Sequence, residues 1–319
     1  MTRCKRWRRL ALPLACLSVL FGLQGASATP LNLPPAATQG LDLLYAGHPD
    51  QALDLFRGIE AGQPDHPLGY LLEAEARWWL IYCETCSIKW NMIDAWPQAS
   101  RAADDSYLTL SDKVTKLAEA QIAKSDSAEM ELYAGLGWML RARLLALRNE
   151  RLATARAGVM GRQHFLRCLQ LDPQMADADT GMGIYNYYVD TLSAIAKLLR
   201  LFMGIPGGSK RDGIRELQTA MQEGVLTRVT ARFYLAKNLR TFELDYAGAI
   251  DAMTPLVNQY PQNPMFQLIL GDAQAKLNHK EQAGAAFGAA AGSPVTDIAC
   301  AVRIRMVAEQ AEAALGSRP

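Results

Sequence analysis

The stretch FQLILGDAQAKLNHKEQAGAAFGAAA, residues 266–291, indicates the fold of the chain. It reads as two helices joined by a short turn, with the small residue Gly271 in the first helix and Ala283 twelve positions later in the second. Small residues let two helices approach closely, and the bulky Phe287, one turn after Ala283, fills the space that is left. The stretch therefore predicts a pair of antiparallel helices.

The same pattern occurs elsewhere in the chain. A small residue is followed four positions later by a bulky one and eight positions after that by Pro, which stops a helix. The three sets are Ala52, Phe56 and Pro64; Gly161, Phe165 and Pro173; and Ala249, Met253 and Pro261. Positions 249, 253 and 256 recur 34 residues later as Ala283, Phe287 and Ala290. The spacing predicts a repeat of helix pairs along the chain.

This 34-residue unit resembles the tetratricopeptide-repeat family, which carries small, aromatic and Pro residues at these offsets. The resemblance covers most of residues 36–291. It implies an all-α fold, a right-handed superhelical solenoid of antiparallel helix pairs whose first helices line a concave face. The chain departs from the pattern at Val295, where a closing Pro is expected. As a whole it also resembles a group of secreted bacterial repeat proteins without an assigned role, which implies a fold and no chemistry.

Four parts are expected along the chain. They are a signal peptide at 1–28, an N-terminal linker at 29–35, a helical repeat array at 36–291 with an insertion at 87–125, and a C-terminal capping helix and tail at 292–319. The segment 87–125 is treated as an insertion because it fits no 34-residue register. Its apolar residues recur at helical spacing, so we expect one long amphipathic helix there.

The N-terminus predicts export. Five basic residues, all before position 10, precede the apolar run LALPLACLSVLFGL and the small residues at 26–28. This is the pattern of a secretory signal peptide, and the periplasm is the expected location. A lipoprotein attached through Cys16 is the alternative. Without the first 28 residues, 28 of the 33 basic residues face 32 acidic ones, a net charge of −4, which argues against nucleic-acid binding.

The stretch RWWLIYCETCSIKW, residues 77–90, carries Cys83 and Cys86. Thiols tend to pair in an oxidising compartment, so we expect a local structural disulfide between these two. Free packed thiols and a redox or metal centre are the alternatives, while the pairing of Cys168 and Cys300 stays open. No His follows Cys86 and no second Cys-x-x-Cys exists, so the patterns for haem attachment and for zinc are incomplete.

Two further segments allow two interpretations each. GIPGGSKRDG, residues 204–213, lacks the order of a phosphate-binding loop and predicts a turn followed by a helix capped by Ser209 and Asp212. TLSAIAKLLRLFMGIP, residues 191–206, is the most apolar stretch after the signal peptide. It could lie on a membrane surface, but we expect a buried core helix, because an apolar helix usually means burial.

The resemblance also implies candidate binding residues on the concave face. They are Tyr187, Tyr234, Asn238, Thr241 and Asp272. Aromatic and amide side chains there could stack on and hydrogen-bond a peptide, although Tyr187 and Tyr234 could equally be core aromatics. Some proteins of the family clamp a terminal carboxylate with Lys and Asn, and Asn238 matches that pattern while Tyr234 stands where the Lys is expected.

The expected function is therefore a scaffold without catalytic activity that binds a protein or peptide partner in the cell envelope. The four His residues have no recognisable partners at triad or ligand spacing. No cofactor and no metal are expected. Two alternatives stay open: a thiol–disulfide or metal-handling protein using Cys83 and Cys86, and a membrane-surface protein using residues 191–206.

Overall fold

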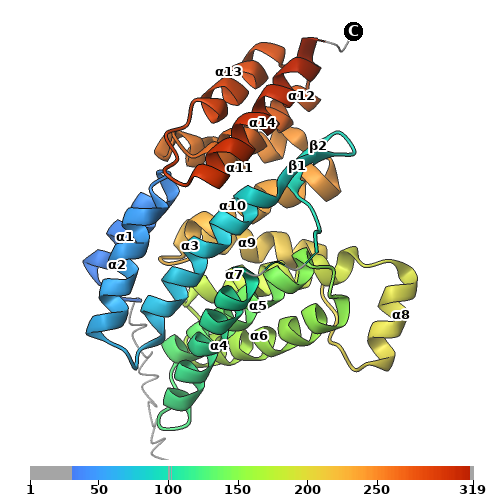
Figure 1. Ribbon diagram of the computed structural model, residues 1–319. Helices are drawn as coiled ribbons and strands as arrows, with labels where there is room; N and C mark the ends of the chain where they lie inside the picture. The colour runs from blue at the N-terminus through green and yellow to red at the C-terminus, as the bar shows by residue number, and fades with distance from the viewer. Residues whose placement is uncertain (1–30, 100, 102, 317–319) are drawn as a thin grey trace, which may run out of the picture.

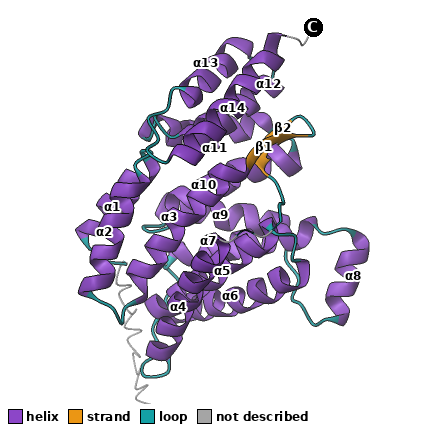
Figure 2. Cartoon of the chain, viewed as in Figure 1, coloured by secondary structure: helices purple, strands orange, loops and turns teal. Residues whose placement is uncertain are grey.

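The computed structural model describes residues 31–99, 101 and 103–316, and the expected signal peptide at 1–28 lies outside them. The described residues form fourteen α-helices, one π-helical turn and one short β-hairpin (Figure 1, Figure 2). The expectation of an all-α fold is confirmed.

The elements follow the chain in order. They are α1 (Pro35–Tyr45), α2 (Pro49–Gly62), α3 (Pro67–Thr85), β1 (Cys86–Lys89), β2 (Met92–Ala95), α4 (Ala103–Ile122), α5 (Ala128–Leu147), α6 (Arg151–Leu171), α7 (Ala176–Thr191), α8 (Ala194–Phe202), α9 (Lys210–Glu223), α10 (Arg228–Asn238), the π-helical turn η1 (Leu239–Glu243), α11 (Tyr246–Gln259), α12 (Pro264–Lys276), α13 (Lys280–Ala291) and α14 (Ile298–Gly316).

Successive helices pack on one another from α1 to α14, with α8 as the exception, because α7 packs directly on α9. The short connections hold each pair antiparallel. Pro residues begin α1, α2, α3 and α12, where the missing N–H costs no helical hydrogen bond. The chain is thus an array of helix pairs in sequence order.

The small and bulky residues of the repeat pack as the sequence predicts. Ala283 and Phe287 are buried in α13, and a Cβ added at Gly271 of α12 would lie 2.6 Å from the Phe287 ring. Phe165 of α6 occupies the same kind of place against Gly181 of α7. The ring of one helix therefore lies directly on the backbone of its neighbour, which only Gly allows.

The array closes on itself. The last helix, α14, packs against α3 and β1 near the beginning of the chain. Tyr260 donates a hydrogen bond of 2.8 Å to Asp42, and Asn263 donates one of 2.9 Å to the carbonyl of Tyr45. These contacts join the α11–α12 connection to α1 across 218 residues of sequence. The side of the array that an open solenoid would expose is consequently filled by α3.

The expected insertion at 87–125 contains two different structures. The β1–β2 hairpin pairs Cys86 with Ala95 and Lys89 with Met92, and residues 90 and 91 both have positive φ, as a two-residue hairpin turn requires. The long helix expected there is α4, and it packs between α3 and α5 as one more member of the array. The hairpin was not predicted.

Candidate functional site

The concave-face residues named from the sequence are mostly buried. Tyr187, Tyr234, Asn238 and Asp272 are all buried, and Thr241 is half-buried. Their burial leaves little of these side chains accessible to a bound peptide in this structure. The alternative interpretation of Tyr187 and Tyr234, as core aromatics, fits their burial.

A buried cluster of ion pairs joins the hairpin to helices that come from distant parts of the chain. Arg240 Nη1 lies 2.7 Å from Asp272 Oδ2, and Arg240 Nη2 lies 3.4 Å from Asp94 Oδ2. Asp94, on β2, also lies 3.0 Å from Lys237 Nζ and accepts a hydrogen bond of 2.5 Å from the Tyr82 hydroxyl. We call these five residues, Tyr82, Asp94, Lys237, Arg240 and Asp272, the central cluster.

The central cluster is internally compensated. Arg240 has no exposed surface, and each carboxylate of the cluster faces at least one cation. Burial, followed by the charge of Asp94, raises the pKa of Tyr82 well above its usual value, so its hydroxyl stays a hydrogen-bond donor. The cluster fixes the hairpin to α3, η1 and α12.

A second buried pair lies between α3 and α5. Glu75 is paired with Arg143, and it also accepts hydrogen bonds of 3.1 Å from Trp79 Nε1 and 3.2 Å from Thr230 Oγ1. The Arg143 guanidinium lies 4.8 Å from the Trp78 ring centroid. Sequence reasoning missed both clusters, because directly bonded partners such as Glu75 and Thr230 stand as much as 155 residues apart and share no local pattern.

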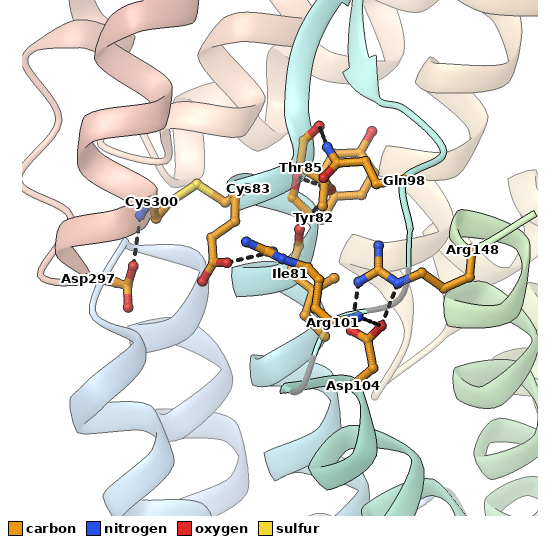
Figure 3. Close-up of polar contacts among 11 residues, drawn as sticks. Ile81, Tyr82, Cys83, Thr85, Gln98, Arg101, Asp104, Arg148, Asp297 and Cys300 are labelled. Carbon is orange, nitrogen blue, oxygen red and sulfur yellow. Dashed lines mark hydrogen bonds and ion pairs between the residues drawn. A yellow bond between two sulfur atoms is a disulfide. The ribbon is translucent and has the colours of Figure 1, made fainter.

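The cysteines pair differently from the expectation. Cys83 forms a disulfide with Cys300 of α14, not with Cys86, and the two Cα atoms are 5.4 Å apart (Figure 3). The Cys300 amide is held by Asp297, whose carboxylate accepts its hydrogen bond at 2.8 Å. The local pairing is wrong because Cys83 lies in the last turn of α3 facing α14, whereas Cys86 has already entered β1.

The two remaining thiols are buried. Burial raises the pKa of the Cys86 thiol far above its ordinary value and raises the pKa of Cys168 to about 12. A protonated, inaccessible thiol is a poor nucleophile and a poor metal ligand. Cys83 and Cys86 therefore do not form a redox pair in this structure.

The cap predicted in residues 204–213 is confirmed. The Ser209 hydroxyl accepts a hydrogen bond of 3.3 Å from the Asp212 amide at the start of α9. Lys210, which a phosphate-binding loop would use, instead forms an ion pair of 2.8 Å with Glu243.

An open groove runs over the outer surface of α4, α5 and α6. Its volume is about 800 Å³. Trp138, Leu145 and Leu152 give it an apolar floor and edge. Three of its cations, Lys116, Arg151 and Arg156, are exposed and have no ion-pair partner among the residues that the structure describes, and the same holds for one carboxylate, Glu150. The groove was not foreseen, because its residues come from three helices.

The apolar segment 191–206 is not a core helix, and that expectation is wrong. It breaks after α7 at Thr191 and forms the short helix α8. Leu198, Leu201 and Phe202 of α8 are 55%, 66% and 81% exposed. The segment is apolar but has little to pack against, since α8 makes no extensive contact with another element in the described part of the chain.

Within residues 31–99, 101 and 103–316, no three His, Cys, Asp or Glu side chains gather so that they could hold a metal ion. None of the helices in this part of the chain combines the length and the apolar character needed to cross a bilayer. No family model matches the chain, and comparison with curated proteins gives no match either.

Proposed function

We propose that the protein is an exported helical-repeat scaffold of the tetratricopeptide type that holds a protein partner in the cell envelope, without catalytic activity of its own. The ordered helix pairs and the Gly-on-ring packing support the repeat assignment. The Cys83–Cys300 disulfide supports export, because disulfides form and persist in oxidising compartments.

The groove between α4, α5 and α6 is the observation that carries this proposal. Partner binding on the concave face is no longer the best assignment, since its residues are buried. The outer groove combines an aromatic side chain, aliphatic side chains and charges on a fixed surface. Interfaces with proteins use this combination, in which a few apolar anchors bind and a charged rim selects.

The groove also suggests the chemistry of the partner. Arg141 is already paired with Asp112 at 2.5 Å, and Trp138 Nε1 donates to Glu119 at 3.4 Å, so these side chains line the walls. Lys116, Arg151 and Arg156 against Glu150 leave a net positive charge for a ligand. We therefore propose a protein segment that presents an apolar side chain to Leu152 and acidic side chains to these cations.

The experiment is site-specific photo-cross-linking in cells that export the protein. A photoreactive residue replaces Leu152, 49% exposed at the edge of the groove, and in a control replaces the exposed Gln282 on α13. We expect a discrete protein adduct at position 152 and none at 282. The variant Arg156→Glu, carrying the same probe, should reduce the adduct because it reverses the charge that attracts the partner.

Two results would overturn the proposal. One is equal labelling at positions 152 and 282, which would mean random collision. The other is an adduct at 152 that persists in Arg156→Glu and also survives high salt. The thiol–disulfide alternative gains no support, because Cys83 is already paired with Cys300 and Cys86 is buried.

A further inference from the structure

α8 is an exposed amphipathic helix at the edge of the molecule. It lies at the right of Figure 1, on the connection between α7 and α9. Leu198, Leu201 and Phe202 are separated by three and four residues, so their side chains share one face of the helix. Met203, directly after the helix, is 51% exposed. Four large apolar side chains thus face solvent on a segment of a few residues.

The apolar surface continues beside α8. Leu192, in the connection that follows α7, is also exposed. Phe242 of η1 is partly exposed, and its ring centroid lies 5.8 Å from that of Tyr188 near the end of α7. Isolated apolar residues on a surface are ordinary, but several large ones gathered on one short exposed helix mark a site of interaction.

Basic residues outnumber acidic ones in the segment that carries this surface. Between Asp190 and Asp212 the chain carries Lys197, Arg200 and two further basic residues at 210 and 211, and no acidic residue. Lys197 and Arg200 stand three residues apart, on the face of α8 opposite to Leu198 and Phe202. Asp190 compensates part of this charge through its ion pair of 2.8 Å with Lys197. Arg211 is exposed and has no ion-pair partner in the described part of the chain.

We propose that residues 192–205 dock the protein on an anionic lipid bilayer, with the apolar face of α8 inserted at the level of the headgroups. An interfacial helix needs large apolar side chains on one face and Lys or Arg on the other, and α8 has both. The basic residues of this flank, of which Arg211 is exposed and unpaired among the described residues, attract the negative charge of anionic lipids. This site is separate from the groove on α4, α5 and α6, and its test is independent of the proposed function.

A bilayer fits this surface better than a second protein does. α8 stands apart from the other helices (Figure 1), so a protein would need a pocket shaped for it, while a fluid interface accommodates it directly. α8 has nine residues, about 14 Å at 1.5 Å per residue, which suits a helix lying flat in the interface. The helix is far too short to cross the apolar layer, which is about 30 Å thick.

The test is flotation of the full chain, purified with its disulfide intact, on lipid vesicles. One set of vesicles contains phosphatidylcholine alone, and the other contains phosphatidylcholine mixed with phosphatidylglycerol. We expect flotation with the mixed vesicles and little with the neutral ones. The double variant Leu201→Ser and Phe202→Ser should weaken binding on the order of a hundredfold, about tenfold for each lost apolar anchor.

Two control variants sharpen the result. Val302→Ser with Met306→Ser removes exposed apolar side chains from α14 and should leave flotation unchanged. Arg211→Gln should reduce binding at low salt and make it less sensitive to salt. Circular dichroism of each variant verifies that the fold is kept, which is expected because the replaced side chains on α8 are exposed.

Three results would overturn the proposal. The first is a native protein that stays in solution with both kinds of vesicle. The second is equal flotation of the native protein and the Leu201, Phe202 variant. The third is a photoreactive residue at position 202 that labels a protein and no lipid in native envelope, which would make a protein the occupant of α8.

Discussion

Removing the Cys83–Cys300 disulfide by Cys300→Ser should destabilise the protein strongly. The bond closes a loop of 217 residues, larger than most single-disulfide loops. Cross-linking lowers the entropy of the unfolded chain by about 2.1 + 1.5R ln n in cal per mol per K, where n is the number of residues in the loop. For this loop the result is about 5 kcal/mol at room temperature. Because a native bond rarely reaches this limit, we expect a loss of about 3–5 kcal/mol in the free energy of unfolding.

The assay is equilibrium unfolding in guanidinium chloride, followed by far-UV circular dichroism. Cys168→Ser is the matched control, because Cys168 is buried as a free thiol and closes no loop. Reductant should lower the stability of the native protein to that of Cys300→Ser and leave Cys300→Ser unchanged. This comparison separates the contribution of the disulfide bond to stability from that of the packing of the Cys300 side chain.

The reasoning would be refuted in either of two ways. Cys300→Ser could lose no more stability than Cys168→Ser, which would mean that the disulfide constrains the unfolded chain little. Alternatively, peptide mapping without reductant could recover Cys83 linked to Cys86, which would mean that the local pair forms and α14 is not tied to α3.

Three further predictions concern the packing. Arg240→Met should destabilise the protein by about 3–5 kcal/mol, since it leaves the buried carboxylate of Asp272 without its closest cation. Gly213→Ala should lower the free energy of unfolding by about 1–3 kcal/mol, because the new Cβ would lie 2.7 Å from two backbone atoms of α7. In the control Gly58→Ala the new Cβ meets no atom within 4 Å, so this variant should be neutral or slightly stabilising. Burial raises the pKa of Glu216 to about 7, so protonation of this group stabilises the folded state fully below pH 4.5. This contribution to the free energy of unfolding is lost as the pH rises towards and through 7, and Glu216→Gln should flatten the resulting decline in stability.

Thermal and chemical unfolding test these three predictions. A loss in Arg240→Met no greater than in the exposed-site control Arg305→Met would contradict the role of the central cluster. Equal stability of the Gly213 and Gly58 variants would contradict the close approach of α9 to α7. An unchanged decline of stability between pH 5 and 7.5 in Glu216→Gln would assign that decline to other carboxylates.

The helix pairs could be predicted from the sequence because their signals are local. Ala283 and Phe287 stand one turn apart, and Gly271 belongs to the helix directly before them. Ser209 caps α9 through an amide three residues further on. Each of these features depends on residues within about two helices of one another, so spacing alone carries the information.

The closure of the array could not be predicted in the same way. The disulfide joins positions 83 and 300, and the pair of Glu75 with Arg143 joins α3 to α5. Such contacts depend on how many helices precede them and on how the array curves. The sequence offers a nearer partner for Cys83 in Cys86, so local reasoning chose it.

The sequence did not predict the hairpin or the exposure of α8, for two different reasons. The two-residue turn of the hairpin places Trp90 and Asn91 at positive φ, and Trp gives no signal for that conformation. For α8, composition indicated an apolar helix correctly but could not say whether a neighbour covers it. Apolar residues at helical spacing occur both on buried helices and on helices that bind an interface.

The closed array is the central claim, and hydrogen exchange followed by mass spectrometry tests it most directly. If α14 closes the array on α3, the amides of α3 and α10 exchange only through global unfolding and are protected far more than those of α8. Cys300→Ser should reduce this protection while leaving the exchange of α8 unchanged. Amides of α3 that exchange as fast as those of α8 in the native, disulfide-bonded protein would contradict the claim, because the concave face would then be open to a partner.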